Sequence, residues 1–339
     1  MDADSRKLRR ITRSRRLGPP IFSPDGKRIA FTGGIFQNDI FIRNLDCFEQ
    51  RQLTVNAGYN HGLAFRPNGM QIVFVRQDAY YEENNNIHMI NSDGTGERQL
   101  THTNRDSRPA FSPDGHHIVF VSIRNGQSSE IYKLDLESGE ETQLTHAWPE
   151  AAPQIGPGPR NSHAKFSPNG EHIVFEAVRR GLPRAHQEIY VMKADGTEQT
   201  RLTHTTGSCH SPVYSPDGQK IAFVCRPSGS KKGYIHTVNA DGTERTQWQA
   251  SEDVQSIDAF GPDSRVLAFT ARDAEKSDKY GQDFDIFTLN VQNGNAQRIT
   301  DNTGSNRDAA FGPTARKFVF ISDRDGAEAI YMREMGPKS

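Results

Sequence analysis

A ten-residue pattern that recurs seven times constrains this chain more than any other feature. The first copy reads FSPDGKRIAF and the third reads FSPDGHHIVF. Every copy begins at an aromatic residue: Phe22, Phe65, Phe111, Phe166, Tyr214, Phe260 and Phe311. These lead aromatics stand 43, 46, 55, 48, 46 and 51 residues apart. A long, nearly constant period indicates a repeat protein in which each unit is one supersecondary structure.

Each unit contains four short segments with alternating apolar and polar residues. In the first unit they end at Phe22 and then cover residues 27–32, 39–44 and 51–54. Pro-Asp-Gly supplies the first turn, because proline presets φ and glycine accepts a positive φ without steric cost. Asp-Gly, Ser-Gly or Asn-Gly joins the last two segments in later units, and these dipeptides favour tight hairpins. The pattern therefore predicts four antiparallel strands per unit.

Isolated four-stranded sheets leave apolar faces uncovered. Burial of one Phe, Ile or Leu side chain stabilises a fold by about 1.5–3 kcal/mol, so neighbouring sheets are expected to stack. Radial stacking of seven sheets predicts an all-β fold, a seven-bladed β-propeller. We expect the lead aromatics to be buried between blades in equivalent places.

The two ends of the chain indicate how the ring closes. Residues 7–12, KLRRIT, match the RQLT, TQLT, TRLT and QRIT segments that close other units, yet they precede the first repeat. The seventh unit stops at AIYMREMGPKS and lacks this segment. The N-terminal strand is therefore expected to complete the last blade, beside residues 329–334, which makes residues 1–339 a single propeller domain.

Composition excludes several classes of function. The 41 Lys and Arg residues balance 42 Asp and Glu residues, so no global field attracts nucleic acid. No apolar run is long enough for a membrane span, and the start lacks the apolar region of a secretory signal. Cys47, Cys209 and Cys225 cannot form a full disulfide framework and suit a reducing compartment. These features predict a soluble cytoplasmic protein, or a periplasmic one if a leader was removed.

The repeat resembles that of a known family. The sequence [FY]-x-P-[DN]-G, a following I-[AV]-F-x-[ST] strand, an I-Y-x-[ML] strand and a closing R-x-L-T are similar to the TolB-type WD-like propeller repeat, over roughly residues 7–334. The resemblance implies a propeller used mainly as a protein-binding platform. Related repeats also form the propellers of prolyl-oligopeptidase-like peptidases and oligogalacturonate lyases. No G-x-S-x-G nucleophile motif occurs in the chain, which disfavours the peptidase reading.

The positions three and four residues before each lead aromatic, here called the mouth positions, are the candidate site. They vary sharply while the frame repeats, so they mark where individual blades are specialised. The candidates there are His61, Arg108, His163, His210, Arg307 and Asp308. Arg179 and Arg180 add a basic loop beside the fourth blade. Because side chains alternate along a regular strand, only one of the two sets is expected to face the channel, and we favour the set with Arg108, His163 and Asp308.

These observations predict a non-enzymatic, monomeric propeller that binds a protein segment or a small anionic ligand at the channel mouth. It needs no cofactor and no metal, because no motif with metal-ligand spacing occurs. The alternative is a metal-dependent lyase or hydrolase that acts on acidic oligosaccharides. That enzyme would need clustered histidines around a metal and cationic residues for the uronate carboxylates, and His61, His163, His210 and the arginines are the residues that keep it open.

Overall fold

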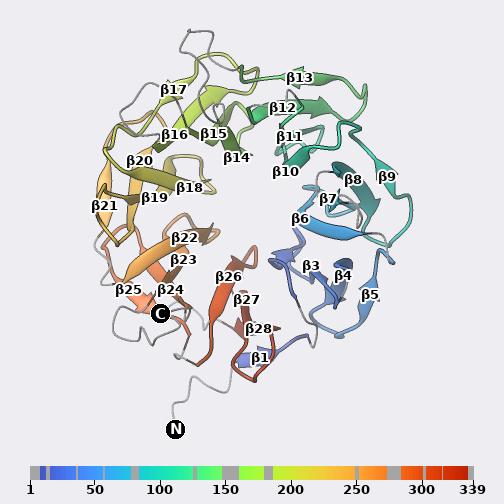
Figure 1. The fold of residues 1–339 in the computed structure, drawn as a ribbon. Coiled ribbons are helices and arrows are strands. Elements are labelled where there is room, and N and C mark those ends of the chain that lie inside the picture. Colours follow the sequence, from blue (N-terminus) through green and yellow to red (C-terminus); the bar gives the residue numbers. More distant parts are fainter. Residues whose placement is uncertain are drawn as a thin grey trace.

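The computed structural model describes residues 8–12, 16–35, 37–55, 58–77, 84–124, 128–146, 160–178, 186–248, 252–272, 284–300, 303–314 and 316–334. Within these ranges the regular elements are 28 strands and no helices. They form seven four-stranded antiparallel sheets, arranged as blades around a central axis (Figure 1). The predicted all-β, seven-bladed propeller is confirmed. No helix in this part of the chain is long and apolar enough to cross a membrane.

The blades share one strand order from the axis outward, and are numbered here by their lead aromatics. The innermost strands are β2 (Ile21–Phe22), β6 (Tyr59–Phe65), β10 (Asp106–Phe111), β14 (Arg160–Phe166), β18 (Ser208–Tyr214), β22 (Asp253–Phe260) and β26 (Asn306–Phe311). The second strands are β3 (Arg28–Gly33), β7 (Gln71–Gln77), β11 (His117–Ser122), β15 (His172–Val178), β19 (Lys220–Arg226), β23 (Val266–Arg272) and β27 (Lys317–Ser322).

The outer half of each blade is a hairpin. The third strands are β4 (Asp39–Asn44), β8 (Asn85–Asn91), β12 (Glu130–Asp135), β16 (Gln187–Lys193), β20 (Tyr234–Asn239), β24 (Phe284–Asn290) and β28 (Ala329–Glu334). The outermost strands are β5 (Gln50–Gln52), β9 (Arg98–Gln99), β13 (Glu141–Gln143), β17 (Thr200–Arg201), β21 (Thr246–Trp248), β25 (Ala296–Arg298) and, for blade 7, β1 (Leu8–Arg10).

The ring closes by strand exchange, as the sequence predicted. Strand β1 pairs antiparallel with β28, with Leu8 opposite Arg333 and Arg10 opposite Tyr331. The pairing continues past β1, where the backbone N–H of Ile11 donates to the carbonyl of Ile330 at 2.7 Å. The first described residues of the chain therefore hold its last strand.

A threonine hydrogen bond explains the closing R-x-L-T segment of the repeat. The Thr54 hydroxyl accepts the backbone N–H of Ile40 at 2.9 Å and donates to Asp39 at 3.0 Å. The corresponding pairs in blades 3 and 6 follow the same pattern. Thr12 makes the equivalent bond to the N–H of Ile330 at 2.9 Å across the ring closure. This threonine fastens each outermost strand to the third strand.

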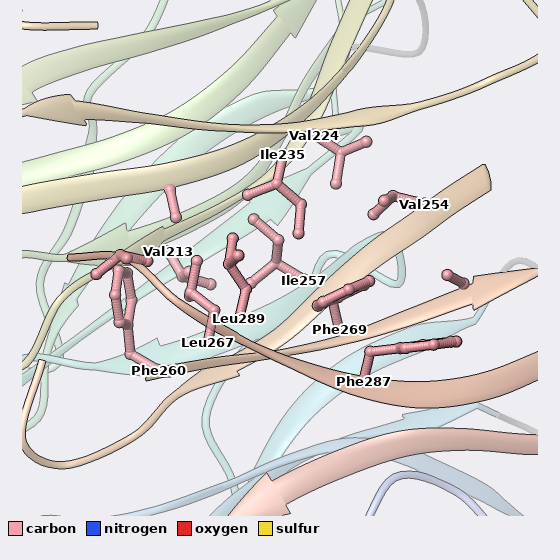
Figure 2. Close-up of a cluster of buried hydrophobic side chains, with 13 residues drawn as sticks. Val213, Val224, Ile235, Val254, Ile257, Phe260, Leu267, Phe269, Phe287 and Leu289 are labelled. Carbon is pink, nitrogen blue, oxygen red and sulfur yellow. The ribbon is translucent and has the colours of Figure 1, made fainter. Parts of the chain in front are cut away.

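Seven buried apolar clusters among the described residues form the core, and each lies between two adjacent blades. Figure 2 shows the cluster between blades 5 and 6, where Val213, Val224 and Ile235 face Phe269 and Leu289. One fully buried aromatic occupies the same place on the second strand of each blade: Phe31, Phe74, Phe120, Phe175, Phe223, Phe269 and Phe320. Each stacks on a ring of the third strand.

The lead aromatics are less enclosed than predicted. They occupy equivalent places at the edges of the seven clusters, but only Phe260 is classed as buried, at 9% exposure, and the other six are half-buried. The prediction that all seven are buried was therefore wrong in degree. The reason is that each lead aromatic is the last residue of its strand, next to a turn at the edge of the blade.

A cationic cavity as the candidate ligand site

A β-bulge shapes the mouth positions in five blades. The ladder between the first two strands shifts register there in blades 2, 3, 4, 5 and 7. The residue three before the lead aromatic has a positive φ in each case: Gly62 (64°), Arg108 (55°), His163 (51°), Ser211 (56°) and Asp308 (56°). A positive φ is strained for residues other than glycine, by roughly 1–3 kcal/mol. The β-bulge therefore gives the four side chains at these positions a direction that a regular strand would not.

Side chains do not alternate between the two faces of the strand at the mouth positions, because the β-bulge makes the strand irregular there. A cavity of about 350 Å³ is lined by residues from both mouth positions, with His61 from the fourth position and Arg108 and His163 from the third. The innermost strands of blades 1 to 4 surround it, and those strands lie next to the axis (Figure 1). The remaining lining residues are Pro19, Ile21, Thr32, Gly62, Leu63, Pro109, Ala110, Ala164 and Lys165.

Arg108, His163 and Glu176 form a hydrogen-bonded chain at the wall of this cavity. The Arg108 guanidinium donates from Nη1 to His163 Nε2, and His163 Nδ1 lies 2.7 Å from Glu176 Oε2. Because a guanidinium can only donate, Nε2 must be the unprotonated nitrogen and Nδ1–H must donate to the carboxylate. His163 is thus held as one neutral tautomer, with its Nε2 lone pair directed at Arg108.

Glu176 is the anchor of this chain. Its side chain is 1% exposed, and it lies on β15 opposite Ser162. It accepts hydrogen bonds from Ser162 Oγ at 2.9 Å, from the backbone N–H of Ser211 at 2.6 Å and from Gln187 Nε2. Burial raises the pKa of Glu176, but the hydrogen bonds from His163, Ser211 and Ser162 outweigh it and hold that pKa below its usual range. The carboxylate is therefore ionised and joins blades 4 and 5.

Three further nitrogen bases lie in or near the cavity. The Lys165 side chain is exposed, yet desolvation of its ammonium by the surrounding protein lowers its pKa, which Glu176 partly offsets. Burial and the charge of Arg108 lower the pKa of His61. His210, which contacts Ser211 Oγ at 3.1 Å, also has a pKa lowered by burial. These shifts disfavour the protonated forms of the three groups, so the guanidinium of Arg108 is the main positive charge that an anion would meet in the cavity.

The other predicted site residues have different surroundings. Arg307 donates to the carbonyl of Leu17 at 3.1 Å and to Glu328 at 2.7 Å, and it also pairs with Asp308. The backbone N–H of Leu17 donates to the same Glu328. These bonds connect blade 7 to the start of blade 1, so the structure does not bring Arg307 and Asp308 into the cavity with Arg108 and His163. Arg179 and Arg180 lie outside the described residues.

Sequence reasoning missed Lys165 and Glu176, although both carry a signal. Lys165 stands directly before a lead aromatic, where other blades have Ile, Ala or Val. Glu176 lies on the second strand at the position of Val75, Val121 and Val224. Comparing every repeat position among the seven blades, rather than the mouth positions alone, would have found both.

Asp258 is a third residue that the sequence reasoning missed. It accepts hydrogen bonds from Ser256 at 2.9 Å and Thr270 at 2.8 Å. Burial raises its pKa to about 7, and the nearby Asp308 charge contributes in the same direction. This carboxyl group therefore holds a proton more readily than an ordinary aspartic acid does, on the side of the ring formed by blades 6 and 7.

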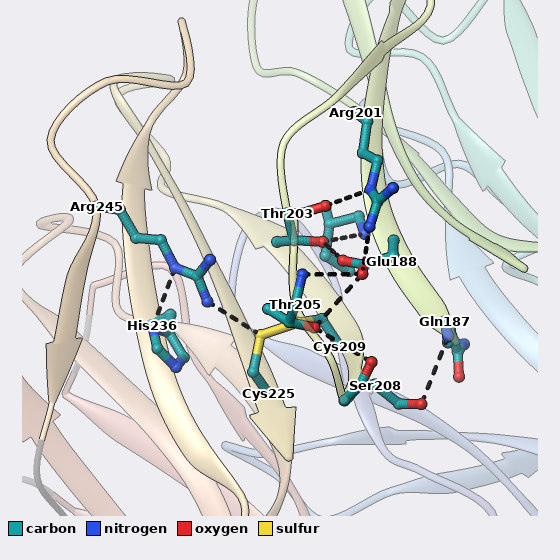
Figure 3. The surroundings of a disulfide bond; sticks show 12 residues. Gln187, Glu188, Arg201, Thr203, Thr205, Ser208, Cys209, Cys225, His236 and Arg245 are labelled. Atoms are coloured by element: carbon teal, nitrogen blue, oxygen red, sulfur yellow. Dashed lines mark hydrogen bonds and ion pairs between the residues drawn. A yellow bond between two sulfur atoms is a disulfide. The ribbon is translucent and has the colours of Figure 1, made fainter. Parts of the chain in front are cut away.

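A disulfide lies directly beside the mouth position of blade 5. Cys209 on β18 and Cys225 on β19 face each other across the ladder and are joined by a disulfide, whereas Cys47 is free and exposed. Figure 3 shows Arg245 next to Cys225 and the Glu188 hydrogen bonds next to Cys209. Disulfides persist mainly in oxidising compartments, so this bond bears on the reducing compartment that the cysteine count suggested.

Metal binding was required for the lyase alternative. The described residues contain no group of three or more His, Cys, Asp or Glu side chains placed to hold a metal ion. His163 Nε2 is hydrogen-bonded to Arg108, a cation, which opposes a second positive charge at that atom. The residues of the cavity fit an anion better than a metal.

Comparison with known proteins identifies the family. The model of the TolB beta propeller domain matches residues 1–160 and 157–279. The chain belongs to the TolB beta-propeller family. An uncharacterised protein of Agrobacterium fabrum is 28% identical over 227 residues, which cover 65% of this chain and 70% of that protein. A TolB homologue of Chlorobium chlorochromatii is 31% identical over 160 residues, 46% of this chain and 31% of the homologue.

A solved structure supports the fold over the full length. The oligogalacturonate lyase of Vibrio parahaemolyticus superposes with a TM-score of 0.76 at 18% sequence identity, and the match covers 99% of this chain and 96% of the lyase. At that identity the likeness shows the propeller architecture alone. This chain spans 31% of the length of the TolB homologue that it matches, so the activity and partners of whole TolB proteins do not transfer with the family.

Proposed function

We propose that this TolB-family propeller is a binding protein that captures an anionic group, carried by a protein segment or a small ligand, in the cavity beside Arg108, His163 and Lys165. The observation that carries the proposal is the Arg108–His163–Glu176 chain. In this chain a buried, ionised carboxylate and a strained backbone hold two basic side chains at the cavity wall. A strained backbone combined with a buried charge is typical of a binding site rather than of a solvated surface.

The ligand chemistry follows from the donors. A guanidinium pairs with a carboxylate through two parallel hydrogen bonds, and the Lys165 ammonium supplies a point charge beside it. Ile21, Leu63, Ala110 and Ala164 line the same cavity and suit an apolar group next to the charge. An acidic side chain, a C-terminal carboxylate or a uronate fits this combination.

The test removes donors without disturbing the frame. Arg108→Asn keeps a residue that tolerates a positive φ, and Lys165→Met keeps an apolar stem. Binding of a short poly-glutamate peptide and of trigalacturonate is measured by calorimetry for each variant. We expect both replacements to weaken binding at least tenfold, while Arg316→Asn, an exposed arginine of the opposite face, binds as the wild type does. Equal affinity in all four proteins would refute the proposal.

A lyase acting on an acidic saccharide is the second candidate. The specific observation in its favour is Lys165, an amine with a lowered pKa that shares a cavity with a carboxylate-binding arginine, as a base that abstracts a proton next to a uronate carboxylate requires. The same trigalacturonate titration distinguishes the candidates. Ultraviolet absorbance from an unsaturated uronate product would support the lyase, and binding without turnover would support the binding protein.

The disulfide favours an oxidising compartment, the periplasmic alternative, over the cytoplasm. Alkylation of the protein under denaturing, non-reducing conditions tests this directly. One modified thiol, Cys47, is expected after isolation from native cells. Three modified thiols would place the protein in a reducing compartment.

A further inference from the structure

A groove on the opposite face of the ring is a further hollow, separate from the mouth cavity. In an antiparallel blade, the turn between strands one and two lies at the same edge as the turn between strands three and four, and the mouth lies at the other edge. A cavity of about 500 Å³ opens among these turns in blade 2. A neighbouring cavity of about 220 Å³ shares Arg28, Ser92 and Asp93 with it, so the two form one groove across the boundary of blades 1 and 2.

Blade 2 departs from the repeat at this groove. The residue after the lead aromatic is serine in four blades and glycine in two, but arginine, Arg66, in blade 2. The serine normally closes the turn, as Ser23 does with the Asp25 carboxylate at 2.5 Å and with the N–H of Arg28 at 3.0 Å. Four residues further on, the other blades carry Lys, His, Glu, Gln or Arg, whereas blade 2 carries Met70, which is 68% exposed. Blade 2 therefore lacks the hydrogen bonds with which the serine hydroxyl closes this turn, and it exposes an apolar side chain.

The groove is lined by basic side chains and by one exposed apolar side chain, that of Met70. Arg66 donates to Gln71 Oε1 at 2.6 Å, and Arg28 donates to the carbonyl of Gly69 at 3.3 Å. Each guanidinium has five N–H donors in all, so each retains donors for a ligand. Arg51 extends the basic surface into the smaller cavity.

Two carboxylates face this basic surface. Asp93 already accepts two hydrogen bonds from Thr95, which lower its pKa, and Glu49 is exposed at the far end. Three arginines therefore outnumber the carboxylates of the groove.

We propose that this groove binds an acidic peptide segment of a partner protein, with one Asp or Glu carboxylate between Arg28 and Arg66 and an apolar side chain on Met70. Charge complementarity selects the carboxylate, and methionine offers an adaptable apolar contact. The amides of Asn68, Gln71 and Asn91 line the groove and can pair with an extended peptide backbone. Two joined cavities suit a segment better than a single small anion. This site is independent of the proposed function of the mouth.

The test exchanges the blade 2 residues for those of the frame. Arg66→Ser installs the serine found at this position in blade 1, and Met70→Lys installs the residue at the position of Lys27. Both are compatible with folding, because blade 4 combines serine with asparagine in the same turn, where Ser167 Oγ bonds Asn169 at 2.6 Å. Arg265→Ser is the matched control, since it removes an exposed arginine from the equivalent turn region of blade 6.

The probe is a fluorescent pool of short capped peptides, each with two acidic residues and one leucine, measured by polarisation. We expect binding to wild type and to Arg265→Ser, and at least tenfold weaker binding to Arg66→Ser and to Met70→Lys. The same exchanges made in the Arg108→Asn background, where the mouth site is weakened, should give the same loss of binding, because the groove is a separate site. Failure of the pool to bind wild type, equal binding to Arg66→Ser and Arg265→Ser, or displacement by inorganic phosphate at equal concentration would each overturn the proposal.

Discussion

The position of a side chain within its repeat determines its structural role in the ring. The second-strand phenylalanines are fully buried between blades, whereas the lead aromatics lie at the cluster edges. Histidines replace third-strand aromatics in two blades, where His88 stacks on Phe74 and His236 on Phe223. These histidines are part of the core, so the histidines of functional interest are those at the mouth.

Replacing a second-strand phenylalanine should cost more than replacing a lead aromatic. Phe120 is 0% exposed, and Phe120→Ala is expected to lower the free energy of unfolding by about 3–5 kcal/mol through lost burial and a cavity. Phe111→Ala, at the half-buried lead position of the same blade, should cost clearly less. Urea denaturation of both variants makes the comparison. A larger loss for Phe111→Ala would mean that the lead aromatics are the true core.

The buried His236 should make stability depend on pH. Burial, reinforced by Arg245, lowers its pKa to about 4 from an ordinary value of 6.5. Between these values the unfolded state binds a proton that the folded state does not. The free energy of unfolding should therefore fall as pH drops through this window, by at most roughly 1.4 kcal/mol per pH unit.

His236→Phe, which matches Phe41 and Phe287 in the equivalent positions, should flatten that slope. His116→Gln, at an exposed position, serves as the control and should leave the slope unchanged. The measurement is thermal or urea unfolding at a series of pH values. An identical slope in wild type and His236→Phe would show that His236 binds a proton equally well in the folded and unfolded states.

At the scale of strands and turns, the regular features follow from the sequence and the irregular ones do not. Strand order, hairpins and ring closure were predictable because Pro-Asp-Gly and Asp-Gly fix turns and R-x-L-T recurs. The β-bulges were not, because Gly62 alone signals a positive φ, while Arg108 and His163 adopt it under constraint from neighbouring strands. The varied mouth positions revealed part of the candidate site. Glu176 and Lys165 were missed because they lie outside the mouth positions, although each differs from its equivalents in the other blades.

The disulfide joins two strands of blade 5, at a position where other blades have a buried polar residue that bonds the preceding blade. In blades 4 and 7 a buried asparagine, Asn161 or Asn306, donates to an acidic residue of the preceding blade. Cys209 takes that position in blade 5. The bond closes a sequence separation of 16 residues, for which chain-entropy arguments give about 3 kcal/mol.

Cys209→Ala combined with Cys225→Ala should therefore lower stability by about 3 kcal/mol, and reductant should have no further effect on that variant. Cys47→Ala, which removes the free thiol, is the control and should match wild type. Chemical denaturation with and without a dithiol reductant measures both. Unchanged stability in the double variant would show that the two sulfurs are not bonded in the native protein.

The whole molecule is a ring held closed by its N-terminal strand. Leu8 packs on the cluster between blades 6 and 7, Ile11 is 4% exposed, and Thr12 bonds the last strand. Arg307 and Glu328 add a second connection between blade 7 and Leu17. Closure therefore depends on a short segment with contacts to two interfaces.

Deleting residues 1–12 should lower the free energy of unfolding by several kcal/mol, because two apolar side chains and one ladder edge are lost. Thr12→Val should cost about 1–2 kcal/mol by leaving the N–H of Ile330 without its hydroxyl partner, and Thr12→Ser should restore most of it. Differential scanning calorimetry measures all three. A truncated protein with the wild-type melting temperature would contradict closure by strand exchange.

The cavity beside Arg108, His163 and Lys165 is proposed to be an anion site. Anomalous diffraction from crystals soaked in bromide tests this most directly, because bromide reports both the position and the occupancy of a bound anion. We expect a bromide peak within hydrogen-bonding distance of Arg108 and Lys165, and its loss in Arg108→Asn. Bromide found only on the outer surface of the ring, with none in the cavity, would show that the cavity is not an anion site.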